Sequence, residues 1–218
     1  MKYKYILAID PSGNFREGHG TTGWVLMDYN ANLITRGCIE AKQYRCAEEF
    51  WDRHAELIRL YNHQYKDDLL VVIEEYRLYG QRAKNQTNSL LETPRVIGIM
   101  QWCCWDLEQP YSMQLASSVK NRWSDDVLFQ EGYFKQRSNY IIDSKSGMSL
   151  KSDHMRDAYR HAIHYVITRN EENKKPKYNN KGAYNNVRSN YQSRRRETQA
   201  NTRTSRDSYR RSTRQRVW

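Results

Sequence analysis

Three acidic residues stand in contexts where a carboxylate is costly unless it binds a cation or a partner. Asp10 ends the apolar stretch ILAIDPSG, Glu74 follows the uninterrupted apolar run LLVVI, and Asp157 lies within SDHMRDAYRHAIHY. Magnesium prefers oxygen ligands and is usually held by a few carboxylates together with substrate phosphate. Two such ions can activate a water and stabilise the leaving oxygen of a phosphodiester. These acids therefore predict a site for Mg²⁺ or Mn²⁺, with two ions, that hydrolyses phosphodiesters.

Each acid also has a simpler interpretation. An aspartate before proline is commonly a turn residue, a glutamate pair at a strand end is commonly a solvated edge, and Asp157 could be an ordinary surface acid of a helix. Successive side chains of a strand point to opposite faces, so only one of Glu74 and Glu75 can share a site with Asp10. We choose Glu74 because it directly follows the apolar run. Glu75 is then expected to contact solvent or Arg77.

The segment around Asp157 adds titratable neighbours at helical spacing. His154 precedes Asp157 by three residues and His161 follows it by four, so the three can share one helix face. Asp153 precedes Asp157 by four residues and is a further candidate. A histidine that caps a helix or pairs with an acid is the commoner case, but histidine also titrates near neutral pH. We predict His154 as a fourth catalytic residue, acting on the scissile phosphate or on a metal-bound water.

The elements that must position these residues follow from the hydrophobic pattern. Strands are expected over 2–9, 22–28, 33–40, 69–73 and 111–116, and helices over 46–65, 88–107, near 117–123, near 125–132, and over 150–168 after a polar loop. Three strands followed by helix, strand, helix, strand and a closing helix indicate an α/β domain. The expected architecture is a mixed five-stranded sheet with helices on both faces.

Charge is distributed unevenly along the 218 residues. Residues 1–168 contain 21 Lys and Arg against 21 Asp and Glu, whereas residues 169–218 contain 15 against 4 and so carry the whole net charge of +11. The second segment has almost no aliphatic residues, and we predict it to be disordered. Its arginines alternate with tyrosines, which suits binding to phosphates and stacking on unpaired bases. A purely solubilising tail is the alternative. The expected domains are thus 1–168 and a basic tail, 169–218.

Several classes of protein are disfavoured. No apolar run approaches the roughly 20 residues of a membrane span, and no signal peptide is recognisable, so a cytoplasmic protein is expected. The four cysteines, Cys38, Cys46, Cys103 and Cys104, fit neither a zinc site nor a disulfide framework. They are expected to be free thiols in a reducing compartment.

At this point the acidic motifs resemble a known family. ILAIDPSG is similar to the first-strand motif of RuvC-like Holliday junction resolvases, VVIEEYR to the strand of their second acid, and HMRDAYRHAIHY to their closing helix, especially in phage members. The segments GTTGW and TPRVIG, and the stretch bearing Lys120, add to the likeness, which spans about residues 3–166. The segment SNYIIDSKSGMSLKSD cannot be aligned with the family.

The resemblance implies a ribonuclease H-like fold and a Mg²⁺- or Mn²⁺-dependent endonuclease that acts on branched DNA as a homodimer, in DNA recombination and repair. It implies that Asp10, Glu74 and Asp157 bind metal, with His154 at a position that is Asp or His in the family. A phage-encoded member would work in the host cytoplasm. Two alternatives stay open: a ribonuclease H that cuts RNA–DNA hybrids, and a non-catalytic nucleic-acid-binding or packaging protein that uses the basic tail.

Overall fold

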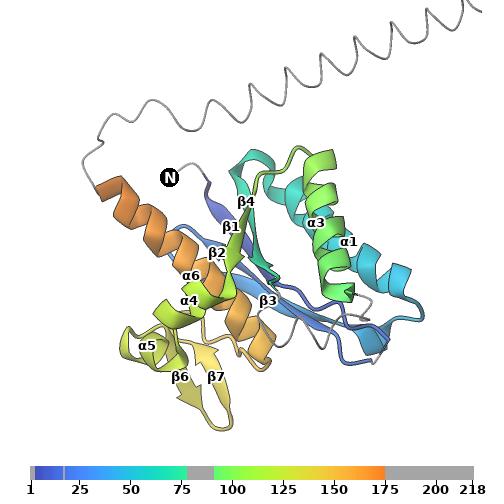
Figure 1. Ribbon diagram of the computed structural model, residues 1–218. Helices are drawn as coiled ribbons and strands as arrows, with labels where there is room; N and C mark the ends of the chain where they lie inside the picture. The colour runs from blue at the N-terminus through green and yellow to red at the C-terminus, as the bar shows by residue number, and fades with distance from the viewer. Residues whose placement is uncertain (1–2, 17, 78–90, 175–218) are drawn as a thin grey trace, which may run out of the picture. The chain divides into compact units, whose positions relative to one another are not determined.

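The predicted fold class, an α/β domain with a mixed five-stranded sheet between helices, is confirmed by the computed structural model (Figure 1). The structure describes residues 3–16, 18–77 and 91–174, so the part of the predicted tail beyond residue 174 lies outside the described residues. The elements are β1 (Tyr5–Asp10), β2 (Thr21–Asp28), β3 (Leu33–Glu40), the 3₁₀ turn η1 (Ala41–Gln43), α1 (Ala47–Tyr65), the 3₁₀ turn η2 (Lys66–Asp68), β4 (Leu69–Glu75), α3 (Glu92–Asp106), β5 (Tyr111–Leu115), α4 (Ala116–Arg122), α5 (Asp125–Gln130), β6 (Phe134–Arg137), β7 (Tyr140–Asp143) and α6 (Asp153–Lys174).

The sheet has the strand order β3-β2-β1-β4-β5. β1 and β2 pair antiparallel, as do β2 and β3, whereas β1 and β4 are parallel and β5 continues parallel to β4. Ile9 lies opposite Ile73, so Asp10 and Glu74 are the next residues on two neighbouring parallel strands. Two acids 64 positions apart in the sequence are thereby brought to the same edge of the sheet.

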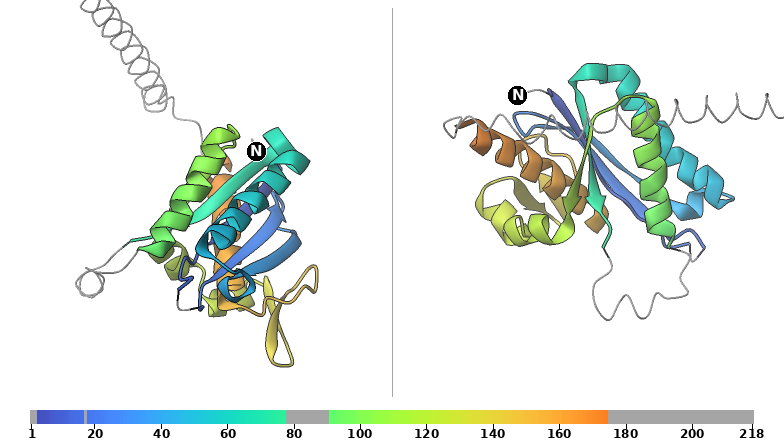
Figure 2. Two further views of the ribbon diagram at one scale, coloured as in Figure 1. Left: turned by 90° about the vertical axis from the view of Figure 1, so that its right-hand side faces the viewer. Right: turned by 45° about the horizontal axis from the view of Figure 1, so that its top comes forward.

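Both faces of the sheet are apolar and covered. Alternate residues of β1 point to opposite sides: Leu7 and Ile9 join the core beneath α1 and α3, and Ile6 and Ala8 join the core beneath α6. Figures 1 and 2 show α1 and α3 on one side of the sheet and α6 and α4 on the other. The continuous apolar run of β4 is thus explained, because each of its side chains meets a helix on one face or the other.

A buried histidine fastens the loop that follows Asp10. His54 in α1 lies with Nδ1 2.7 Å from the carbonyl oxygen of Phe50, so Nδ1–H donates and Nε2 accepts from the Thr22 hydroxyl at 2.8 Å. The same hydroxyl oxygen accepts the backbone N–H of Ser12 at 2.9 Å. Burial lowers the pKa of His54 to about 4, outweighing the hydrogen bond to Phe50. At neutral pH the folded protein therefore contains His54 with an uncharged ring.

Because His54 has an ordinary pKa near 6.5 when unfolded and about 4 when folded, the unfolded chain binds more protons between these values. The free energy of unfolding should therefore fall as the pH drops from 6.5 to 4, by up to about 3 kcal/mol from this residue. Urea unfolding at intervals of pH should show that His54→Gln flattens the dependence. His63→Gln, which alters an exposed histidine of the same helix, is the control. An unchanged slope in His54→Gln would contradict this role.

One prediction was wrong: the segment read as a polar loop before the last helix contains a β-hairpin. β6 and β7 form a separate two-stranded antiparallel sheet, in which Phe134 lies opposite Asp143 and Arg137 opposite Tyr140. The two residues of the turn include Ser138, whose φ of 53° is left-handed. The hairpin was missed because its strands are only four residues long and its turn contains none of the glycines that usually mark such turns.

The last helix begins at Asp153, three residues later than expected, and continues to Lys174, beyond the boundary expected at residue 168. Its apolar residues Ala158, Ala162, Ile163 and Val166 are all buried. In the described part of the chain, no helix has both the length and the apolar character required to cross a bilayer.

Candidate metal centre

Asp10 is the last residue of β1 and one of the few acids in the buried part of the domain. It is 6% exposed, and Pro11 directly follows it. Burial raises the pKa of Asp10 to about 6; the nearby charges of Glu74 and Asp157 act in the same direction, whereas a hydrogen bond and the charge of His154 oppose the rise. A negative charge on this buried carboxylate is therefore costly unless a cation or another partner offsets it.

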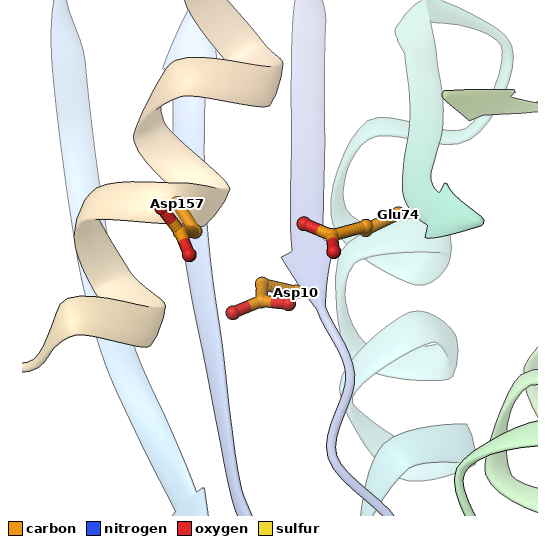
Figure 3. Close-up of side chains that lie close together, drawn as sticks. All are labelled: Asp10, Glu74 and Asp157. Carbon is orange, nitrogen blue, oxygen red and sulfur yellow. The ribbon is translucent and has the colours of Figure 1, made fainter. Parts of the chain in front are cut away.

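Three carboxylates from three different elements converge at this point. Asp10 comes from β1, Glu74 from β4 and Asp157 from α6, and Figure 3 shows their carboxyl groups turned toward a common centre. One oxygen of each lies within 4.8 Å of the others. Their side chains reach solvent only slightly, at 16% for Glu74 and 15% for Asp157. The sequence predicted this set of three residues, and the structure brings them together.

Strand alternation separates the two adjacent glutamates as expected. Glu74 turns toward Asp10, while Glu75 accepts a hydrogen bond from Nε of Arg77 at 2.9 Å. The choice of Glu74 over Glu75 as a neighbour of Asp10 is thus confirmed by the geometry.

His154 contacts the same cluster. Its Nδ1 lies 2.6 Å from Oδ2 of Asp10, and the hydrogen bond to that carboxylate raises the pKa of His154 against the opposing effect of burial. The imidazole is 40% exposed, so one side contacts Asp10 while the ring remains accessible. Asp153, the other candidate from this turn, is 85% exposed and pairs with Arg156 instead. The structure therefore places His154 at the cluster and Asp153 outside it.

His161 lies on the same helix and orients Glu74. Its Nε2 is 2.8 Å from Oε2 of Glu74, and its Nδ1 is 2.8 Å from Oε1 of Gln114 in β5. An ionised carboxylate only accepts hydrogen bonds, so Nε2 carries the proton that is donated to Glu74. His161 is fully buried. The spacing of the helix predicted that His161 shares a face with Asp157, but Gln114 was not predicted, because β4–β5 pairing brings it here.

Two basic side chains balance the acids. Nζ of Lys120 lies 2.8 Å from Oδ2 of Asp157 and 3.8 Å from Oε2 of Glu74. Burial lowers the pKa of Lys120, but its hydrogen bond to Asp157 and the surrounding negative charges outweigh that effect and raise it. Arg160 binds the other oxygen of Asp157 and also reaches Asp125. The sequence did not indicate these contacts of Lys120, which follow from the position of α4.

A glycine permits the close approach of α6 to the sheet. Gly23 in β2 lies opposite Asp10, and a Cβ atom at this position would be only 2.1 Å from the backbone carbonyl carbon of His154. The first turn of α6 therefore lies directly against the backbone of β2. Without this contact, His154 and Asp157 could not reach the end of β1.

The donor set fits a hard divalent cation. All three groups offer carboxylate oxygens, which are the ligands that Mg²⁺ and Mn²⁺ take. Their separation of up to 4.8 Å is close to the distance of about 4 Å between opposite oxygens around one Mg²⁺. Within the described residues this is the single cluster of His, Cys, Asp and Glu side chains with such geometry. The four cysteines are free thiols, and none belongs to it.

No protein-family model matches the chain, and no curated protein matches it significantly. Solved structures, in contrast, do match the chain. The structure of T. thermophilus RuvC in complex with Holliday junction substrate superposes with a TM-score of 0.54 and 15% sequence identity, covering 77% of this chain and 96% of that one. The structure of Thermus thermophilus RuvC by itself gives a TM-score of 0.52 with the same identity and coverage. At this identity the likeness shows a common, ribonuclease H-like fold.

Proposed function

We propose that this protein is a divalent-metal-dependent endonuclease that cuts branched DNA, with a four-way junction as its substrate. The observation that carries the proposal is the convergence of Asp10, Glu74 and Asp157 from three elements of a RuvC-like fold. The related structure binds a Holliday junction, which favours junctions over other branched substrates. A role in DNA recombination and repair would follow from that substrate.

In this proposal Asp10, Glu74 and Asp157 hold two Mg²⁺ or Mn²⁺ ions between them. When bound, the ions would activate the attacking water and neutralise charge on the leaving sugar oxygen. His161 keeps Glu74 turned inward, since its ring donates to that carboxylate from a fully buried position. Nζ of Lys120 lies 2.8 Å from Asp157 and 3.8 Å from Glu74, and in this proposal it would contact the scissile phosphate once cations neutralise these acids.

His154 is proposed as the residue that moves a proton. Its Nδ1 lies 2.6 Å from Oδ2 of Asp10, and this hydrogen bond raises the pKa of His154. The side chain of His154 is 40% exposed, so a substrate could reach the ring. In the proposed role the doubly protonated ring keeps its Nδ1 hydrogen bond to Asp10 and donates its Nε2 proton to the leaving oxygen, which leaves a neutral imidazole.

A cleavage panel tests the proposal. The full chain would be incubated with matched four-way junction, fork, flap, linear duplex and RNA–DNA hybrid, each with Mg²⁺, Mn²⁺ or Ca²⁺. Paired cuts in the junction with Mg²⁺ or Mn²⁺ are expected, with the linear duplex left intact. Preferential cutting of the hybrid would instead identify a ribonuclease H. Binding to all substrates without cleavage under any ion would favour the packaging alternative.

A homodimer is part of the proposal. Each chain offers one carboxylate cluster among its described residues, and the paired cuts that resolve a junction need two. Helix α3 exposes two large rings, Trp102 at 56% and Trp105 at 69%, three residues apart and thus on one helix face. Leu60, on the neighbouring helix α1, is also exposed at 55%. Exposed tryptophans of this kind are typical of protein interfaces.

Sedimentation equilibrium should therefore give a mass of about twice 26.2 kDa for the wild type. The double variant Trp102→Ala/Trp105→Ala should sediment as a monomer and lose paired cutting, because the buried aromatic area would be lost. Tyr29→Ala, at an exposed ring in the β2–β3 turn, serves as the control. A monomeric wild type would overturn the dimer, and a dimeric double variant would overturn this face as its interface.

The division of the chain into a nuclease body and a basic DNA-binding segment stays a proposal. Helix α6 continues to Lys174, and Glu171 within it pairs with Arg122 of α4 at 2.6 Å. A truncation that removes the Arg/Tyr-rich segment should therefore end after residue 174 and not at residue 168.

A further inference from the structure

The β6–β7 hairpin is fixed to the helix that carries Asp157. Phe134 and Asp143 are opposite one another and share the inner face of the hairpin. The ring of Phe134 lies 5.1 Å from the ring of Tyr159, and the Tyr159 hydroxyl donates to Oδ1 of Asp143 at 2.7 Å. Phe134, Asp143 and Tyr159 are all buried. The hairpin thus has a rigid attachment two residues beyond Asp157 in α6.

The outer face of the hairpin is basic. Lys135 and Arg137 alternate with Phe134 along β6, so they point away from Tyr159. Tyr140 lies directly opposite Arg137 and shares its face, and Nζ of Lys151 lies 5.9 Å from the centre of the Tyr140 ring. Lys135, Arg137 and Lys151 are all exposed. We call these four residues the outer hairpin face.

This face concentrates positive charge in a domain whose basic and acidic residues are equal in number over residues 1–168. Residues 133–151 contain four basic residues, Lys135, Arg137, Lys145 and Lys151, against the single acid Asp143, which is buried on the inner face. In the described part of the chain, no acidic side chain forms an ion pair with Lys135, Arg137 or Lys151. Elsewhere on the surface, exposed basic residues such as Lys42, Arg53 and Arg59 do pair with acids.

We propose that the outer hairpin face binds the sugar–phosphate backbone of a DNA arm next to the cleavage site. The inference rests on the proposed nuclease function and adds the element that holds the substrate. Unpaired cations on a protruding element complement the negative charge of phosphates, and such contacts position DNA without reading its sequence. The hairpin projects from the domain near the first turn of α6, where His154 and Asp157 lie (Figures 1 and 2). A DNA strand that enters the metal centre would therefore pass beside it.

The test compares two triple variants of the full chain, each in an Asp10→Asn background so that DNA is bound without being cut. One variant is Lys135→Ala/Arg137→Ala/Lys151→Ala; the control, Lys42→Ala/Arg53→Ala/Arg59→Ala, removes the same charge from ion-paired positions. Binding to a fluorescent four-way junction would be followed by anisotropy between 50 and 200 mM salt. Thermal unfolding of both variants checks that they fold.

The hairpin variant should bind at least about tenfold more weakly at 100 mM salt, with the slope of log affinity against log salt reduced by about 2 to 3. The control should keep the affinity and the slope of its parent. If the hairpin variant binds like its parent, or if both variants weaken equally, the hairpin proposal is overturned while junction cleavage by the wild type would leave the nuclease proposal standing. A wild type that neither binds nor cuts branched DNA would overturn both.

Discussion

Asp10→Asn is expected to reduce metal-dependent cleavage of a four-way junction by about a thousandfold or more, while junction binding is retained. The asparagine side chain has the same shape and keeps an oxygen that can accept from His154, but it lacks the charge that attracts a hard cation. Loss of the stabilisation that metal ions give to the transition state amounts to several kcal/mol. Single-turnover cleavage with Mg²⁺, together with binding measured in Ca²⁺, would show the two effects separately.

The chain supplies close controls for this variant. Asp153→Asn changes an exposed acid in the first turn of α6, and Glu75→Gln changes the neighbour of Glu74 that pairs with Arg77. Both should cleave within a few-fold of the wild type, whereas Glu74→Gln should be as impaired as Asp10→Asn. Full activity in Asp10→Asn would refute the metal centre, and equal losses in Glu74→Gln and Glu75→Gln would refute the assignment by strand parity.

Gly23→Ala should have the largest effect on stability among conservative substitutions near the site. Its Cβ would lie 2.1 Å from the backbone carbonyl carbon of His154, and a helix backbone cannot yield as a flexible side chain does. Either α6 moves away from β2, or the free energy of unfolding falls by about 3 kcal/mol. Because His154 and Asp157 both belong to the displaced part of α6, cleavage should fall as well. Urea unfolding and the junction assay would measure the two consequences.

Gly98→Ala is the matched control. Gly98 is an exposed position within α3, and a Cβ atom there would meet no other atom within 4 Å. Alanine favours the helix more than glycine does, so this variant should be stabilised by about 0.5–1 kcal/mol, with cleavage unchanged. If Gly23→Ala were as stable as the wild type, then α6 would not need the close approach to β2 that the structure shows.

The sequence was sufficient to predict the order of the main elements and the three clustered acids. Asp10 and Glu74 were identifiable because each follows an apolar strand, and parallel pairing then places both at one edge of the sheet. Asp157 was identifiable because the helix around it has buried residues at regular spacing, such as Ala158 and Ala162. These features are local in the sequence, and local patterns are what sequence reasoning detects.

The remaining contacts depend on tertiary structure. Gln114 reaches His161 because β5 pairs with β4, and Lys120 reaches Asp157 because α4 packs beside α6. No spacing in the sequence indicates either contact. The sequence likewise does not indicate that position 23 requires glycine, because the atoms that exclude a side chain there belong to the backbone of His154, 131 positions away. The β6–β7 hairpin was missed for a different reason, namely the brevity of its strands and its unusual turn.

The wide separation of the acids along the chain has a consequence for biosynthesis. Asp10 leaves the ribosome more than 140 residues before His154 and Asp157 do. Until α6 packs against β1 and β2, at most two of the three carboxylates can be brought together. The backbone of Gly23 then has no helix packed against it. Folding limited by such long-range contacts is slow compared with local helix formation. A chain synthesised only as far as β5 would therefore not contain the complete carboxylate cluster.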